Sequence, residues 1–363
     1  MKKKTLTVII LVLLLNCISI ICLYSALHRQ GVLFDNDTFI RHIIWIVLGW
    51  GLVAAIYFVN YRIFYDLSLW LYYACLALLL FVAITGKIQM GAQRWIQIFG
   101  ITFQPSELAK FAAILIICRN FLKERKPALS LARDFFQEIV LPFIPVLALF
   151  LVIFVQPDLG TAAILLFLFI LMRIGAGTKK RNLLILFLIV LIVLPISFSL
   201  LKDYQKERLL VFINPDSDPV GAGYTIIQSK IAIGSGQLFG KGFLAGTQNQ
   251  LNFIPARHTD FIFTVFAEEW GFLGCLALLL IYYLLLKIVL DTAKSVKDKY
   301  SYLLCIGIFS LSFIHIFINL SMIMGLLPVV GLPLMFLSYG GSYTLINFIL
   351  IGILINIQKH TAL

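Results

Sequence analysis

The chain has 363 residues, of which 61% are hydrophobic and only 13% are charged, and its formal net charge is +12. Such a composition excludes a soluble globular protein. Apolar stretches of about 20 residues, long enough to cross a bilayer as helices, recur along the sequence. The sequence therefore predicts an all-α, polytopic membrane protein that forms one integral membrane domain over residues 1–363.

Ten membrane spans are predicted from these stretches. In chain order they cover about 7–26, 43–59, 67–85, 107–121, 138–155, 160–176, 183–201, 269–289, 301–324 and 343–358. The first begins after Lys2 to Lys4 but has no small-residue cleavage site, so we expect a retained span. The fourth and sixth are short, which indicates partly embedded or broken helices.

The distribution of Lys and Arg predicts the orientation of the chain. The basic residues of the connections assigned to the inner side are Arg62, Arg119, Lys123, Arg125, Lys126, Arg133, Arg173, Lys179, Lys180, Arg181, Lys287, Lys294, Lys297 and Lys299. Those of the short outer connections are Arg29, Arg41, Lys87 and Arg94. This bias places both termini in the cytoplasm and one long loop, 202–269, outside. The positive charge then reflects topology and attraction to anionic headgroups, and no nucleic-acid partner is expected.

Six cysteines occur singly within apolar stretches, without metal-type spacing. They are Cys17, Cys22, Cys75, Cys118, Cys275 and Cys305. We interpret them as small packing residues and expect neither a disulfide nor a structural metal site.

The connection before the fourth span carries unusual charges. Pro105 and Ser106 predict a helix start, with Glu107 in the first turn, where the helix dipole favours an anion. Lys110 follows one turn later, inside an apolar stretch, where a charge needs a partner or a wet cavity. Glu107, three residues earlier, is the expected partner. Two interpretations stay open: a structural salt bridge, or the border of a polar cavity in which Arg94 meets an anionic ligand.

Three other polar segments have simpler explanations. Asp158 is best interpreted as the cap of the sixth span. Asp216 and Asp218 lie between prolines and indicate a solvated turn more than a cation site. The glycine-rich segment Gly234–Gly246 does not match a phosphate loop, because glycine follows Lys241 where Ser or Thr is required.

Asp260 stands out in the long loop, after Arg257 and His258 and before an aromatic run. One interpretation is an N-cap for the helix leading into the eighth span. The other is a carboxylate that is desolvated by its apolar surroundings, which would make it a better proton acceptor than a free Asp. Glu268 and Glu269, just before the eighth span, are expected to be interface anchors.

Seven motifs occur in an order that resembles a known family. They are GAQRWI, QPSELAK, QPDLGTA, NPDSDPVGAGYTIIQSKIAIGSG, GKGFLAGTQNQLNFIPARHTDFIF, AEEWG and LPVVGLPLMFLSYGGS. Together they resemble the SEDS family of bacterial cell-wall glycan polymerases, and within it the rod-shape-determining branch. Gln237, Met335 and Tyr343 depart from the family pattern, which affects the expected packing near the tenth span.

The resemblance implies ten spans and a peptidoglycan glycosyltransferase of the bacterial plasma membrane that serves cell elongation and rod shape. The donor would be lipid II, and the acceptor lipid II or the nascent strand. Asp260, in HTDFIF, matches the essential catalytic carboxylate. The expected substrate-binding residues are Arg94, Gln104, Ser106, Glu107, Lys110, Arg257 and His258. Expected partners are a class B penicillin-binding transpeptidase and other membrane proteins of the elongation complex.

The expected chemistry is direct displacement with inversion. Asp260 would act as a general base on the acceptor hydroxyl while a polyprenyl diphosphate leaves. Arg94, Lys110, Arg257 and a divalent cation such as Mg²⁺ or Mn²⁺ are candidates to stabilise the leaving group, and no other cofactor is expected. The alternative from another class is a lipid II flippase that forms no bond. The position of the best carboxylate in an outer loop, rather than at mid-membrane, favours the enzyme.

Overall fold

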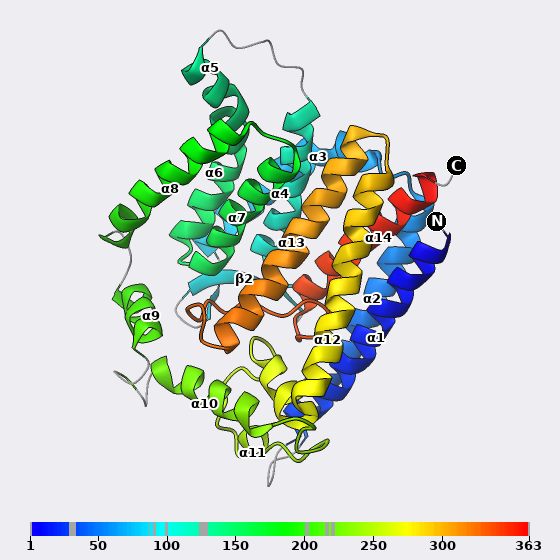
Figure 1. Cartoon of the computed structure of the whole chain (residues 1–363), viewed down its shortest axis with the longest axis vertical. Coiled ribbons are helices and arrows are strands. Elements are labelled where there is room, and N and C mark those ends of the chain that lie inside the picture. Colours follow the sequence, from blue (N-terminus) through cyan, green and yellow to red (C-terminus); the bar gives the residue numbers. More distant parts are fainter. Residues whose placement is uncertain are drawn as a thin grey trace. The chain divides into compact units, whose positions relative to one another are not determined.

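The computed structural model describes residues 2–28, 34–85, 87–89, 92–98, 101–122, 130–199, 203–214, 218 and 222–361 (Figure 1). The chain divides into two compact units, which are described separately below. Unit 1 comprises Met1–Leu52, Leu201–Ile288 and His315–Phe348. Unit 2 comprises Val53–Leu200, Val289–Ile314 and Ile349–Leu363. The expected turn at Asp216 lies outside the described residues.

Helices dominate both units. The long ones are α1 (Lys2–Leu27), α2 (Asn36–Phe58), α3 (Ile63–Thr85), α4 (Pro105–Leu122), α6 (Leu141–Val155), α7 (Leu159–Gly175), α8 (Lys180–Ser199), α12 (Ile262–Ser295), α13 (Lys299–Ile323) and α14 (Gly341–Thr361). A short helix α5 (Leu131–Phe135) and a π-helical turn η1 (Phe136–Val140) lead directly into α6. The predicted helical, membrane-protein class is confirmed.

Seven helical stretches in the described part of the chain are long and apolar enough to cross a membrane. They correspond to α1, α2, α3, α6 with the preceding α5 and η1, α12, α13 and α14, and α7 is apolar but shorter. Each of the ten predicted ranges overlaps a helix. An apolar segment in lipid must satisfy its backbone hydrogen bonds internally, and a helix does so even where it contains a proline, such as Pro145 in α6. The number of ten spans stays a prediction.

Unit 2 contains strands that the sequence analysis did not predict. β1 (Lys87–Gln89), β2 (Ala92–Ile98) and β3 (Ile101–Phe103) form an antiparallel sheet in the order β1-β2-β3. Ile96 pairs with Phe103 in this sheet, so β3 ends just before α4 begins. α4 packs against α3, α6 and α7, and β2 contacts both α3 and α4. The sheet thus helps to position the start of α4 beside α3. The predicted all-α fold is therefore incomplete, because the protein also contains this small sheet.

Unit 1 shows that the predicted loop 202–269 is largely helical. It contains α9 (Asp203–Ile213), α10 (Ala222–Ser235) and α11 (Thr247–Gln250), and its last residues form the start of α12. Figure 1 shows α10 and α11 beside the N-terminal part of α12. α12 begins at Ile262, within the buried aromatic run after Asp260, but it is interrupted at Gly271, whose φ of 64° and ψ of −165° are not helical. The part of α12 after this break begins close to 269, the predicted start of the eighth span.

The segment after α10 lies directly against the backbone of α12. The amide nitrogens of Lys241 and Gly242 donate to the carbonyls of Glu268 and Glu269, each at 3.0 Å. Gly240 adopts φ +82°, and a Cβ there would lie 2.1 Å from the Glu269 carbonyl oxygen. Only glycine combines this left-handed conformation with so close an approach.

Gly240→Ala is therefore expected to destabilise the protein by about 1–3 kcal/mol more than Gly242→Ala, because a backbone carbonyl cannot move aside. Gly242 is the matched control, since its φ is +98° but no atom lies within 4 Å of an added Cβ. Thermal unfolding in detergent compares the two variants. Equal melting temperatures would show that the close approach to α12 contributes nothing.

Candidate functional site

The start of α4 in unit 2 carries the predicted charge pair. Pro105 is the first helical residue and Glu107 lies in the first turn, as the sequence predicts. Lys110 Nζ donates to Glu107 Oε1 at 2.8 Å, which confirms the expected pairing. Lys110 is 0% exposed and Glu107 is 4% exposed. The pair is thus fully buried, where charges are tolerated only with well-placed partners.

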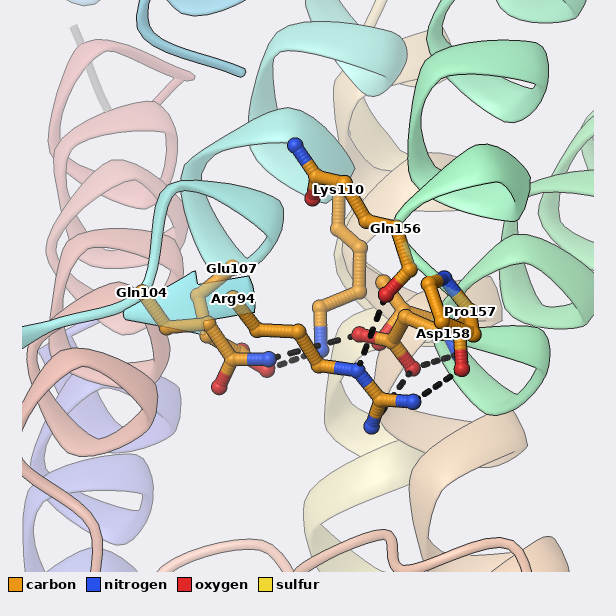
Figure 2. A network of polar contacts seen from close by, with 8 residues as sticks. Arg94, Gln104, Glu107, Lys110, Gln156, Pro157 and Asp158 are labelled. Atoms are coloured by element: carbon orange, nitrogen blue, oxygen red, sulfur yellow. Dashed lines mark hydrogen bonds and ion pairs between the residues drawn. The ribbon is translucent and has the colours of Figure 1, made fainter. Parts of the chain in front are cut away.

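Arg94 on β2 reaches the turn between α6 and α7 (Figure 2). Its guanidinium donates to the carbonyls of Gln156 and Pro157 and lies 3.6 Å from Asp158 Oδ1. Gln104 Nε2 also approaches Asp158, at 3.4 Å. The structure therefore connects the sheet, the start of α4 and the start of α7 through one polar cluster.

Asp158 has two roles in this cluster. Its side chain accepts from Thr161 N at 3.3 Å, which confirms the predicted cap of α7. It also contacts Arg94 and Gln104, two of the predicted site residues. Asp158 therefore joins the candidate site, although the sequence predicted only its role as a cap. The QPDLGTA motif was the signal that pointed to it. An acidic cap that also faces a cation is less costly to bury.

Two polar atoms beside the charge pair lack a hydrogen-bond partner among the described residues: Ser106 Oγ and Glu107 Oε2. Ser106 is 2% exposed. Buried polar atoms are usually satisfied by protein or by bound water. A bound water or a polar ligand would therefore satisfy these two atoms.

Asp260 lies in unit 1, in a turn formed by residues 256–261 just before α12. The amides of Thr259 and Phe261 both donate to the Ala256 carbonyl, and Asp260 is half-buried. Because α12 begins at Ile262, Asp260 lies one position outside the cap, a placement that does not favour the capping interpretation.

The two residues before Thr259 differ in environment. Arg257 is 2% exposed and donates to the carbonyls of Ala26, at 2.8 Å, and Asn249, at 2.7 Å. These bonds connect the end of α1 to α11, so Arg257 has a clear structural function, and its substrate-binding role stays a prediction. His258 is half-buried.

Tyr339, from the segment between α13 and α14, lies beside His258. The two ring centroids are 6.2 Å apart, and Tyr339 N donates to the His258 carbonyl at 3.0 Å. Burial raises the pKa of the Tyr339 hydroxyl above its ordinary value. A tyrosine hydroxyl is neutral near pH 7 even in water, and burial favours this neutral form further.

The expectation that Glu268 and Glu269 are interface anchors is wrong. They are 0% and 3% exposed, in the first turns of α12. Glu268 Oε1 accepts from Lys241 Nζ at 2.7 Å, and Ser25 Oγ donates to Glu269. Both carboxylates hold the outer segment of unit 1 against α12 and α1, because each finds a donor far away in sequence.

The structure thus arranges the predicted site residues in two groups. Arg94, Gln104, Glu107 and Lys110 lie together in unit 2 with Asp158 (Figure 2). Asp260, Arg257 and His258 lie together in unit 1. Their roles as catalytic and substrate-binding residues stay predictions.

Comparison with known proteins gives a consistent relationship over the whole chain. The family model FTSW_RODA_SPOVE, described as cell cycle protein, matches residues 5–363. The peptidoglycan glycosyltransferase MrdB of Escherichia coli K12 is 38% identical over 355 residues, covering 98% of this chain and 93% of that protein. The probable peptidoglycan glycosyltransferase FtsW of Geobacter metallireducens is 33% identical over 367 residues, covering 99% of this chain and 96% of that protein.

A solved structure has a similar fold. It is described as structural coordination of polymerization and crosslinking by a peptidoglycan synthase complex, and one of its chains matches with a TM-score of 0.81 and 28% identity, covering 98% of this chain and 97% of that one. The motifs, the fold and these matches agree along the full length. This chain belongs to the SEDS family, the group of FtsW, RodA and SpoVE proteins.

Proposed function

We propose that this chain polymerises peptidoglycan glycan strands, with lipid II as donor and lipid II or the growing strand as acceptor, during cell elongation. The observation that carries the proposal is the 38% identity, over 98% of the chain, to a peptidoglycan glycosyltransferase. The polar cluster of unit 2 and the half-buried Asp260 of unit 1 supply groups that the reaction requires.

Asp260 is the proposed general base. A sugar hydroxyl is a weak nucleophile. A carboxylate that takes its proton as the bond forms increases the reaction rate about 10²–10⁴-fold. The acceptor oxygen then forms a bond to the anomeric carbon as the bond to the diphosphate breaks, with inversion. The proton moves to Asp260, and the electron pair leaves with the polyprenyl diphosphate.

Arg94 and Lys110 are the proposed cations for the diphosphate. Preorganised charges in a water-poor environment stabilise developing negative charge without reorganising. Lys110 is wholly buried, and the Arg94 side chain is 28% exposed and braced by the turn before α7. Arg257 contributes less to stabilising the diphosphate, because its guanidinium already donates hydrogen bonds to two carbonyls.

A divalent cation, Mg²⁺ or Mn²⁺, is the proposed additional source of positive charge. Mg²⁺ is usually held by one or two carboxylates together with substrate phosphates. In the described part of the chain no three His, Cys, Asp or Glu side chains gather into a metal-binding group. The diphosphate would therefore supply most of the ligands, and chelation followed by re-addition of Mg²⁺ or Mn²⁺ tests the requirement.

The proposal includes a topology and a partner. Ten spans with both termini in the cytoplasm place 202–269 on the outer side of the bacterial plasma membrane, as the Lys and Arg distribution predicts. The similarity to a chain of a polymerization and crosslinking complex supports assembly with a class B penicillin-binding transpeptidase. Other membrane proteins of the elongation complex are proposed to join them.

Two assays on the same purified protein separate this function from its alternative, a lipid II flippase. In detergent with lipid II, we expect glycan chains that a muramidase digests. In vesicles with labelled lipid II, we expect no translocation above that of empty vesicles. Translocation without glycan chains would overturn the proposal.

A further inference from the structure

Asn319, near the end of α13, is wholly buried at 0% exposure and contacts the backbone of Asp260. Its Nδ2 donates to the Asp260 carbonyl at 2.9 Å and to the Leu332 carbonyl at 2.6 Å. A primary amide has two N–H groups, so one side chain serves both acceptors. Asn319 thus joins the turn 256–261 to the segment 325–340, within unit 1.

Two further contacts hold these segments together. Tyr339 N donates to the His258 carbonyl at 3.0 Å, two residues before Asp260. Gly331 adopts φ +71°, and a Cβ there would lie 3.3 Å from Asp260 Oδ2. The backbone of the 325–340 segment therefore lies against the carboxylate itself. Asn319 donates to a carbonyl in each of the two segments at this point.

We infer that Asn319 is a positioning residue for the Asp260 carboxylate, an inference that rests on the proposed function. A general base works only within hydrogen-bond reach of the proton it takes. A misplacement of about 1 Å can lower the rate of the chemical step about 10²-fold. Removing the amide leaves two carbonyls without this donor, and the peptide between Asp260 and Phe261 is then held only from its N–H side, by the bond from Phe261 N to the Ala256 carbonyl, among the bonds described here. The expected loss is in the chemical step, not in substrate binding.

A matched control exists on α14. Asn356 is also 0% exposed, and its Nδ2 donates to the carbonyls of Ile56, at 2.7 Å, and Val59, at 2.6 Å. These bonds fix the end of α2 within unit 2. Asn356→Ala therefore removes the same kind of buried amide from a place that does not contact Asp260.

The test compares Asn319→Ala and Asn356→Ala by their kcat and KM for lipid II, per molecule of monodisperse, folded protein. We expect Asn319→Ala to lower kcat about 10–100-fold with little change in KM, and Asn356→Ala to leave both near wild type. Asn319→Ala should add no further loss to Asp260→Asn, because both act on one group.

Other outcomes count against the inference. Wild-type kcat in Asn319→Ala would overturn it, as would equal losses in both Asn variants or a change in KM alone. If Asn319→Ala does not fold, Asn319→Asp replaces it, keeping the shape without the donors. Failure of both to fold, while Asn356→Ala folds, would assign Asn319 a purely structural role. Absence of glycan chains from the wild-type protein would instead overturn the proposed function.

Discussion

Asp260→Asn is expected to lower the rate of glycan polymerisation by the purified protein at least about a hundredfold. The substitution is nearly isosteric, so the turn 256–261 and the hydrogen bond that it accepts from Asn319 should persist. What it removes is the ability to take a proton from the acceptor hydroxyl. The measurement is the initial rate of chain formation from lipid II at equal amounts of folded protein.

Asp298→Asn is the matched control for this substitution. Asp298 accepts from Ser301 N at 3.0 Å at the start of α13, and Asn serves equally well in such a cap. We expect wild-type activity from Asp298→Asn. Normal glycan chains from Asp260→Asn would remove Asp260 from the mechanism.

Lys110→Ala is expected to damage activity, and also folding, more than Glu107→Ala. The substitution strands the Glu107 carboxylate, which is 4% exposed and whose Oε2 already lacks a partner among the described residues. Breaking a buried pair from one side typically costs about 3–5 kcal/mol. It also removes a proposed cation for the diphosphate. Folded yield and polymerisation rate are measured for each variant.

A double variant, Glu107→Gln with Lys110→Met, separates stability from activity. Replacing both charges by neutral groups of similar size is often neutral for stability. We therefore expect folded protein with strongly reduced polymerisation. Near-wild-type activity in both single variants would show that the pair has no function.

The sequence alone predicted the features that depend on local rules. The start of α4 followed from Pro105 and Glu107, and the Lys110 partner followed from a spacing of three residues on a helix. The cap of α7 by Asp158 is equally local. The helical class followed from apolar composition, because lipid leaves the backbone few alternatives.

The features that the sequence did not predict depend on residues far apart. Glu268 and Glu269 looked exposed because their donors, Lys241 and Ser25, lie 27 and 244 residues away. Asn319 was overlooked because it is one of several single polar residues in an apolar helix, and only the structure shows the carbonyls that it binds. Burial of a polar group becomes explicable once its partner is known.

A single-turnover experiment tests the role of Asp260 most directly. Labelled lipid II is bound to excess protein, wild type or Asp260→Asn, and transfer of one disaccharide is timed after the acceptor is added. The account predicts similar donor binding by both proteins and transfer slowed at least about a hundredfold in the variant. Equal transfer rates would contradict it, because they would show that no proton passes to residue 260 in the bond-forming step.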